Sequence, residues 1–430
     1  MRLVIIGLGP AGFAALLTAK RFKPNIEIVV VDSKEFDLFH PCGLPFYLEG
    51  KIPVEQLKHE LNMNVKIIHK KVKKINIKDK FIQYDNKKIS YDKLIIATGS
   101  LPSIPNINIT SNKVFTLHSI DDAIKINSVL DSAKKIVIVG AGAIGLEVAN
   151  ALLERKKRVY VIELLSHCFA NILDEDMAKL IEDYLIKKGV SFFFNSRVEK
   201  INNHHVYLTN NKIDYDLVIL ATGVKPNIEI VLDSGIKTSR HGIIVNERME
   251  TSVKDVFAAG DCVRTIHFIT KKECSIKTAT VAYQQGIIAG INAVGGDLKY
   301  KGTIGTFVSK IGELEVAGCG LNSLNAKSKF IIAKSRYYTQ DPWVPTKKEL
   351  ILKVLVNSSG NLIGAQAIGS EALHRINILS TLILNKINIK KVGLELGYCP
   401  IVAPVYDILH QVIDLAVRKL RKNEAKLVKS

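Results

Sequence analysis

The sequence has no closely spaced pair of cysteines and no apolar run long enough to span a membrane. Its six cysteines are scattered, with no C-x-x-C pair and no regular framework; they are Cys42, Cys168, Cys262, Cys274, Cys319 and Cys399. This usage argues against a disulfide scaffold and favours a reducing compartment, so we expect a cytoplasmic protein. The first expected strand starts within a few residues of Met1, and we therefore expect no secretory signal.

Acidic residues are few relative to basic ones, since 60 Lys and Arg face 41 Asp and Glu and give a net charge of +19. Such a surface attracts polyanions. The lysines are scattered, however, and no recognisable nucleic-acid-binding module is present, so we expect no nucleic-acid partner. The basic segment at residues 418–422 could touch an anionic membrane, but an interface helix with a solvated end is the preferred interpretation.

The chain has 430 residues, which allows several domains. It contains two glycine-rich motifs. The first, G-L-G-P-A-G at residues 7–12, lies between an apolar run typical of a buried strand and an expected helix. Its glycines allow a tight turn, close approach of a pyrophosphate and close packing of the helix on the strand. The next expected strand ends at Asp32, about twenty residues further on, where a ribose hydroxyl would bind. The motif therefore predicts a dinucleotide site.

The second motif, G-A-G-A-I-G at residues 140–145, repeats this arrangement between a strand at 135–139 and a helix. The strand that follows, at 159–162, ends at Glu163. An acid there accepts a hydrogen bond from a ribose 2′-hydroxyl and repels a 2′-phosphate. Residues 164–166 offer no arginine to bind that phosphate, so NADH is favoured over NADPH.

Three further segments end buried strands in small residues. Two are near-repeats, at 91–99 and 215–223, and both finish in A-T-G. Small side chains at the carboxyl end of a strand leave space for a nucleotide. The third, at 251–261, ends in A-G-D, and the carboxylate of Asp261 is well placed to bind a polyol.

Paired glycine motifs, two A-T-G strands and the A-G-D segment, in this order, resemble the two-dinucleotide-binding flavoprotein disulfide reductases over residues 1 to about 300. The resemblance implies an α/β fold with two Rossmann-like dinucleotide-binding domains, the NAD domain being inserted in the FAD domain, followed by a C-terminal α+β dimerisation domain. The implied FAD-binding domain comprises residues 1–108 and 240–308. The NAD-binding domain would be residues 109–239, and the dimerisation domain residues 309–430.

By this resemblance the first motif holds the adenosine and pyrophosphate of FAD, and Asp261 binds its ribityl chain. A helix opening at Thr278 would face the pyrimidine edge of the flavin. The second motif would hold NADH, with Glu147 near the nicotinamide. The predicted FAD residues are Gly7, Gly9, Pro10, Ala11, Gly12, Asp32, Ser33, Lys34, Thr98, Gly99, Gly260, Asp261, Thr278 and Ala279. The predicted NADH residues are Gly140, Gly142, Ala143, Ile144, Gly145, Glu147, Glu163 and Gly223, and no metal site is expected.

The cysteines separate the branches of this family. Tyr47 stands five residues after Cys42, so the C-x-x-x-x-C of glutathione-reductase-like members is absent. Residues 109–167 contain no cysteine, unlike the thioredoxin-reductase-like members. The chain thus resembles the single-cysteine branch of coenzyme A disulfide reductases, NADH oxidases, NADH peroxidases and persulfide reductases. A lone catalytic cysteine has no resolving partner, so it cycles between a thiolate and a state capped by a substrate thiol or an oxygen.

We therefore predict that electrons pass from NADH through FAD to Cys42, which reduces a disulfide or persulfide such as coenzyme A disulfide. The alternative is an NADH oxidase or peroxidase that reduces oxygen or peroxide. Leu8 and Pro10 occupy the first glycine loop, where peroxidase and oxidase members carry a histidine, which weakens that alternative. A sulfide–quinone oxidoreductase and an electron carrier to a protein such as rubredoxin are further alternatives.

The C-terminal third has no glycine motif. Apolar runs at 350–356 and 362–368 predict a hairpin, and helices are expected at about 371–385 and 405–421. This pattern resembles the interface domain of the family, so we expect a homodimer.

In coenzyme A disulfide reductases, tyrosines of this domain enter the active site of the partner, and Tyr337, Tyr338 and Tyr398 stand where those would be. Tyrosines packed at an interface are the alternative. The segment departs from the usual Y-A-P-P, because Cys399 replaces the alanine and Ile401 the second proline. Lys20 and Arg21 end the first expected helix, where the resemblance places coenzyme A phosphates; a solvated helix end is the alternative.

Overall fold

The chain folds as two compact units, each described here by itself. The computed structural model describes residues 1–429, so Ser430 of the predicted dimerisation domain lies outside the described residues. Unit 1 comprises residues 1–105, 117–124 and 222–303. Unit 2 comprises residues 106–116, 125–221 and the chain from residue 304 onward.

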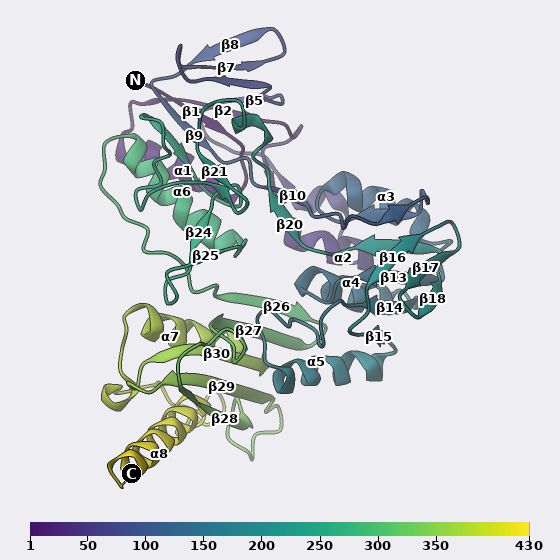
Figure 1. Ribbon diagram of the computed structural model, residues 1–430, viewed down its shortest axis with the longest axis vertical. Helices are drawn as coiled ribbons and strands as arrows, with labels where there is room; N and C mark the ends of the chain where they lie inside the picture. Colours follow the sequence, from purple (N-terminus) through teal and green to yellow (C-terminus); the bar gives the residue numbers. More distant parts are fainter. Residues whose placement is uncertain (430) are drawn as a thin grey trace. The chain divides into compact units, whose positions relative to one another are not determined.

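Unit 1 is built on a five-stranded parallel sheet of order β23-β9-β1-β2-β5. Figure 1 labels four of these strands, β1, β2, β5 and β9. Its three middle strands read as almost unbroken apolar runs, because both faces of a parallel sheet are covered. The strands are β1 (Arg2–Ile6), β2 (Glu27–Asp32), β5 (Lys66–His69), β9 (Lys93–Ile96) and β23 (Val256–Ala258).

Two helices of unit 1, α1 (Pro10–Phe22) and α6 (Ala279–Ala293), pack against each other unusually closely. A Cβ atom on Gly286 would lie 2.2 Å from the carbonyl oxygen of Ala11, and one on Gly290 would lie 2.5 Å from that of Ala15. Only glycine allows this approach, so α6 fixes the start of α1.

Smaller elements complete unit 1. They are α2 (Leu44–Glu49), the pair β3 (Leu38–Phe39) and β4 (Lys58–His59), and the sheet of β6 (Lys74–Asn76), β7 (Phe81–Tyr84) and β8 (Lys87–Ser90). Three more antiparallel pairs are β10 (Ser100–Pro102) with β20 (Val224–Pro226), β21 (Thr238–Ser239) with β22 (Gly242–Ile243), and β24 (Thr265–Ile266) with β25 (Glu273–Cys274).

Unit 2 contains a second parallel sheet of the same kind, in the order β12-β19-β13-β14-β15. Its strands are β12 (Val114–Thr116), β13 (Lys135–Val139), β14 (Arg158–Ile162), β15 (Ser191–Phe193) and β19 (Leu217–Leu220). A mixed sheet of β11 (Asn108–Ile109), β16 (Val198–Ile201), β17 (His205–Leu208) and β18 (Asn211–Asp214) shares an apolar core with it. The helices of this unit are α4 (Ala143–Glu154) and α5 (Glu175–Lys188), and α3 (Ile120–Leu130) has residues 120–124 in unit 1 and the rest in unit 2.

The C-terminal third of the chain is an antiparallel sheet of order β26-β27-β30-β29-β28 with helices. The predicted hairpin is present as β29 (Glu349–Asn357) and β30 (Leu362–Gly369), joined to β26 (Phe307–Ile311), β27 (Leu314–Gly320) and β28 (Phe330–Tyr338). The helices are α7 (Ala372–Leu384) and α8 (Ile408–Lys429). Two parallel α/β sheets and a C-terminal α+β region confirm the predicted fold class. Among the described residues, no helix is both long and apolar enough to cross a bilayer.

A buried lysine joins α5 to the C-terminal sheet within unit 2. The ammonium of Lys353, on β29, lies 2.6 Å from a carboxylate oxygen of Asp174 and 2.6 Å from one of Asp176. Lys353 is only 4% exposed and Asp174 7%. Burial alone would raise the pKa of Asp174, but the hydrogen bond and charge of Lys353 lower it. The stabilisation is therefore present above the pKa of an unfolded aspartate and is lost as the pH falls through the lower, folded value.

Replacing Lys353 with methionine should destabilise unit 2 by about 3–5 kcal/mol, because Asp174 would remain buried without a cation. Urea unfolding followed by circular dichroism at neutral pH measures the loss. The matched control is Lys334→Met, which removes the more exposed partner of Asp176 at 2.7 Å and should cost less than about 1 kcal/mol. Equal losses in the two variants would contradict the assignment.

Candidate functional site

The first glycine loop joins β1 to α1 through a contact that excludes side chains. A Cβ on Gly12 would lie 1.9 Å from the carbonyl oxygen of Gly7, so the helix can start this close to the strand only with glycine there. Gly7 has φ +98° and donates its N–H to Val31. Gly9 caps α1 without a side chain, and a Cβ built on it meets no atom within 4 Å. The helix begins with Pro10, which has no N–H, so Ala11 and Gly12 supply the first free backbone N–H groups of α1.

The second loop, between β13 and α4, has the same construction. A Cβ on Gly145 would lie 2.1 Å from the carbonyl oxygen of Gly140, which has φ +112°. Gly142 caps α4 and, like Gly9, borders open space. Ala143 and Ile144 form the first turn of α4, and the side chain of Ile144 is exposed.

The acids that follow both loops have a role that the sequence analysis missed. One carboxylate oxygen of Asp32 accepts the backbone N–H of Leu8, the residue between the first two glycines of its loop. Glu163 accepts the N–H of Ala141, the equivalent residue of the second loop, at 2.8 Å. Each acid therefore holds its own glycine loop in place. The pairing of motif position two with the acid could have been suspected from the repeat.

The two acids differ in their remaining partners. Asp32 also accepts the N–H of Lys34 and pairs with the Lys34 ammonium at 2.7 Å, while Ser33 between them is exposed. Glu163 accepts a second backbone N–H, from Leu165 at 2.9 Å. In the part of the chain that the structure describes, no lysine or arginine pairs with Glu163.

The two A-T-G segments meet in unit 1. Ser100 to Pro102 pair antiparallel with Val224 to Pro226, directly after Gly99 and Gly223. Both glycines have positive φ and border open space. Thr98 donates its hydroxyl to the carbonyl of Asn227 at 2.6 Å, which fixes the crossing of the two segments. The sequence showed the repeat but not its pairing.

Asp261 lies beside these segments, since the hydroxyl of Ser100 donates to one of its carboxylate oxygens at 3.0 Å. Gly260 donates its N–H to Gln285 on α6 and has φ +87°. Thr278 caps α6 and accepts the N–H of Val281, and Ala279 begins the helix. Unit 1 thus brings together the first loop, Asp32, Gly99 and Asp261 around one sheet.

The six cysteine side chains differ in their exposure to solvent. Cys42 and Cys399 are exposed. Cys42 lies in a short 3-10 turn, Pro41–Gly43, that leads directly into α2. Burial raises the pKa of Cys262, Cys274 and Cys168, and it raises that of Cys319 to about 12. Thiolate chemistry is therefore disfavoured at these four cysteines.

Glu147, on α4, is held by the C-terminal sheet of its own unit. The hydroxyl of Ser309, on β26, donates to its carboxylate at 2.6 Å. Burial raises the pKa of Glu147, and the hydrogen bond from Ser309 opposes the rise. Only the structure could show Ser309 as its partner, because 162 residues separate the two.

The remaining predicted residues lie at the ends of elements. Tyr337 and Tyr338 end β28, with ring centroids 6.1 Å apart, and Tyr398 is 53% exposed. In unit 1, the ammonium of Lys20 donates to the carbonyl of Ile26 at 3.3 Å and so stabilises the turn between α1 and β2. The side chain of Arg21 is exposed. A role for any of these five side chains in substrate binding stays a prediction.

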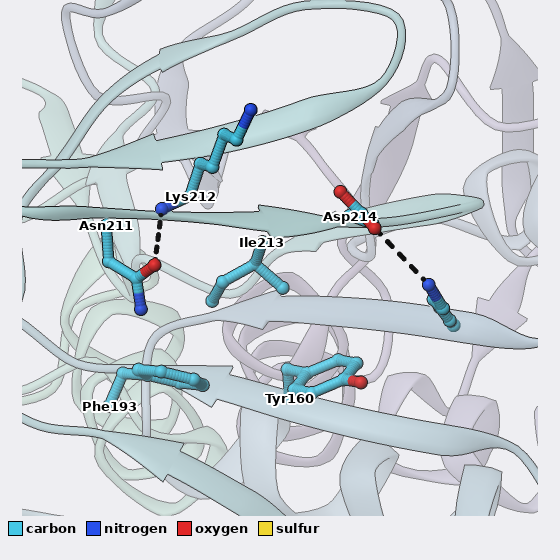
Figure 2. Close-up of a pocket in the computed structure, with 7 residues that line it drawn as sticks. Tyr160, Phe193, Asn211, Lys212, Ile213 and Asp214 are labelled. Atoms are coloured by element: carbon cyan, nitrogen blue, oxygen red, sulfur yellow. Dashed lines mark hydrogen bonds and ion pairs between the residues drawn. The ribbon is translucent and has the colours of Figure 1, made fainter.

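A pocket of about 250 Å³ in unit 2 lies apart from the glycine loop. Figure 2 shows the rings of Tyr160 and Phe193 below the strand that carries Ile213, with the Lys212 side chain directed away from them. Asp214, at its rim, lies 3.5 Å from the Lys135 ammonium and 3.1 Å from Nε2 of His205. None of its lining residues belongs to the predicted site.

Comparison with known proteins places this geometry in a family. The model of the pyridine nucleotide-disulphide oxidoreductases matches residues 1–286. The chain belongs to the pyridine nucleotide-disulphide oxidoreductases. It is 34% identical to a protein named NADH oxidase from Methanocaldococcus jannaschii, with 98% of this chain and 99% of that protein covered. It is 32% identical to a CoA-dependent NAD(P)H sulfur oxidoreductase from Pyrococcus furiosus, with 95% and 97% covered.

Solved structures of pyridine nucleotide-disulphide oxidoreductases share the fold. An NAD-dependent persulfide reductase from A. fulgidus superposes with a TM-score of 0.93 at 31% identity, covering 97% of this chain and 83% of that one. The prediction of a flavin- and pyridine-nucleotide-dependent oxidoreductase is therefore confirmed. The residues of both loops fit such ligands, because the uncapped starts of α1 and α4 supply N–H donors and Gly9 and Gly142 leave room for a pyrophosphate.

Replacement by alanine should affect FAD binding at one glycine of the first loop and protein stability at another. Gly9→Ala should leave the flavin-free protein as stable as the parent, because its φ of −85° suits alanine and no atom is near, but it should weaken FAD binding about tenfold or more by filling the approach to the helix N-terminus. Gly12→Ala should destabilise unit 1 itself. Thermal melting of the apoprotein and FAD titration separate the effects. Parent-like FAD affinity in Gly9→Ala would contradict this placement.

Proposed function

We propose that this enzyme transfers two electrons from NADH, by way of FAD in unit 1, to a mixed disulfide on Cys42, and that its substrate is coenzyme A disulfide or a related persulfide. The observation that carries the proposal is the contrast among the thiols: Cys42 is exposed directly before α2, whereas the other two cysteines of unit 1 have burial-raised pKa values. Relatives named for persulfide, sulfur and coenzyme A disulfide reduction support it.

The sulfur chemistry balances with a single protein thiol. The Cys42 thiolate attacks one sulfur of the disulfide and releases one thiolate, leaving a mixed disulfide on Cys42. Two electrons then cleave that bond and release the second thiol, so NADH, a proton and one disulfide give NAD⁺ and two thiols. Bound FAD supplies the switch between hydride and thiol chemistry. The chain's part is to orient both nucleotides through Asp32, Asp261 and Glu163 and to hold Cys42 accessible.

The domain assignments remain part of this proposal. Residues 1–108 and 240–308 would bind FAD, residues 109–239 would bind NADH, and residues 309–430 would dimerise. Glu163 supports NADH over NADPH, because its partners within residues 1–429 are backbone N–H groups and its carboxylate would repel a 2′-phosphate. The scattered cysteines support a cytoplasmic location.

Cys42→Ser should lower the anaerobic rate of NADH-dependent reduction of coenzyme A disulfide by about a thousandfold or more, as removal of a covalent nucleophile does. NADH should still bleach the flavin, which is followed by visible absorbance. Cys399→Ser, the other exposed thiol, is the matched control and should react at the parent rate. Substantial disulfide reduction by Cys42→Ser, or equal loss in both variants, would overturn the single-thiol scheme.

The relative named NADH oxidase makes oxygen reduction the second candidate. Comparing NADH consumption in air with consumption under nitrogen plus coenzyme A disulfide or persulfide decides between them. Faster turnover in air than with either sulfur substrate under nitrogen would favour the oxidase.

A homodimer is supported by an apolar surface at the end of the C-terminal third, which we name the C-terminal patch. Its exposed members are Trp343, Ile401, Val402 and Val405, between 59% and 66% exposed. The two segments are adjacent, because Asp341 donates its N–H to Pro400 and Gln340 donates to the carbonyl of Ile401. Exposed apolar side chains on adjacent segments are typical of an interaction site, and the resemblance of this region to the family's interface domain suggests a second copy of the chain as the occupant.

Val402→Glu should convert the proposed dimer to a monomer, because a charge would have to be buried at the interface. Light scattering coupled to size-exclusion chromatography gives the mass. Leu324→Glu is the control, since Leu324 is 77% exposed in the loop after β27, and it should leave the mass unchanged. A parent protein of monomer mass would refute the dimer.

A further inference from the structure

Each unit contains a small antiparallel sheet that follows the edge strand of its parallel sheet, and the two are built alike. In unit 1 the sheet β6-β7-β8 follows β5, and in unit 2 the strands β16, β17 and β18 follow β15. On the inner face of each, the register aligns one apolar side chain from every strand. The inner rows are Ile75, Ile82 and Ile89 in unit 1 and Ile201, Val206 and Ile213 in unit 2. Both rows pack into the apolar core of their own unit.

The neighbouring row lies on the outer face, because successive side chains of a strand alternate between faces. The outer rows are Lys74, Gln83 and Lys88 in unit 1 and Lys200, Tyr207 and Lys212 in unit 2. All four lysines are exposed. One ammonium in each sheet lies over an aromatic ring: that of Lys88 is 4.6 Å from the ring centroid of Phe81, and that of Lys200 is 5.9 Å from that of Tyr207.

The two sheets differ in charge. Residues 66–90, from β5 to the end of β8, include nine lysines and two aspartates. The equivalent residues 190–214 include three lysine or arginine residues and two acidic ones. A general excess of lysine in the chain would affect both sheets alike, so it does not explain the difference. The charge is a property of the sheet in unit 1.

Five of these lysines gather at one end of that sheet, around the turn between β7 and β8. Asp85, in the turn, lies 3.9 Å from the Lys70 ammonium and 3.7 Å from that of Lys73. The remaining three flank the last residues of β7, since Gln83 pairs with Lys74 and Lys88, and Tyr84 pairs with Lys87. We name this surface the basic face; its members are Lys70, Lys73, Lys74, Lys87 and Lys88. Five cations around one carboxylate repel one another and attract an anion.

The basic face lacks what most macromolecular partners need. No exposed large apolar side chain of the described chain lies within residues 66–90, so the face has no apolar centre of the kind found in protein interfaces. Lys88 covers Phe81, the aromatic side chain of the outer face, so its ring is not open for stacking on a nucleobase. Every cation of the face is a lysine, whereas arginine is preferred where single phosphates of a nucleic acid are gripped.

We propose that the basic face docks this protein reversibly on the anionic headgroups of a lipid bilayer, without insertion of any segment. An anionic bilayer needs neither an apolar centre nor a stacking ring, because each lysine near its surface contributes about 1 kcal/mol through charge alone. The attraction is electrostatic and is therefore screened by salt. This docking is independent of the nucleotides and of Cys42, and it goes beyond the proposed function.

The test is sedimentation of the whole protein with vesicles of mixed phosphatidylglycerol and phosphatidylcholine, beside vesicles of phosphatidylcholine alone, at about 0.1 M salt. The parent should sediment with the anionic vesicles only and should be released at about 0.5 M salt. Lys74→Gln combined with Lys88→Gln should weaken binding about tenfold or more. The matched control is Lys200→Gln combined with Lys212→Gln, which removes two charges and one contact with an aromatic ring from the equivalent row of unit 2. It should bind as the parent does.

The outcomes separate the alternatives. A parent that does not sediment with anionic vesicles, or an equal loss in the two double variants, overturns the proposal. Tighter binding to duplex DNA than to the vesicles, at equal phosphate concentration, makes a nucleic acid the occupant and also overturns it. Lys73→Gln combined with Lys87→Gln should reproduce the loss, and thermal melting should show that each variant keeps the stability of the parent. None of these results changes the expectation for Cys42→Ser.

Discussion

The direct contact of a helix backbone with the turn before it is the constraint on which both nucleotide loops depend. At Gly12 and again at Gly145, a single Cβ would collide with the carbonyl of the loop's first glycine. The contact brings the helix start to the carboxyl end of the central strand, where its unpaired N–H groups face open space. If the helix stood further off, the acid at the end of the next strand could no longer reach the loop's second residue. The same close packing thus sets the position of the helix start and the distance from the acid to the loop.

The acids then give the two loops different electrostatic character. Asp32 is balanced by the ammonium of Lys34, so the first loop is locally near neutral. Glu163 is held by two backbone N–H groups, and its negative charge is not cancelled by a nearby cation in the described structure. A free 2′-phosphate would meet that charge directly, whereas a 2′-hydroxyl can donate to it. The two loops therefore differ in charge, with a balanced ion pair at the first and a carboxylate held by backbone N–H groups at the second.

Local patterns in the sequence predicted most of this fold. The sequence could not predict which distant segments pair with one another. The glycine loops, their flanking strands and the C-terminal hairpin follow from spacing and apolar runs, because those features are written within a few residues of one another. The pairing of Ser100 with Pro226, the hold of Ser309 on Glu147 and the contact of His69 with Asp37 join segments that only folding brings together. The exposure of Cys42 among mostly buried thiols likewise depends on packing, which no cysteine count reveals.

The buried lysine of the C-terminal sheet is one of two polar links between that sheet and the helices of the second parallel sheet. Lys353 binds Asp174 and Asp176 at the start of α5, while Ser309 binds Glu147 on α4, so two helices of the second parallel sheet are tied to the C-terminal sheet by polar contacts. Buried charges tolerate little displacement, because any opening leaves an ion without its partner. The second glycine loop and the C-terminal third are consequently joined by polar contacts within unit 2.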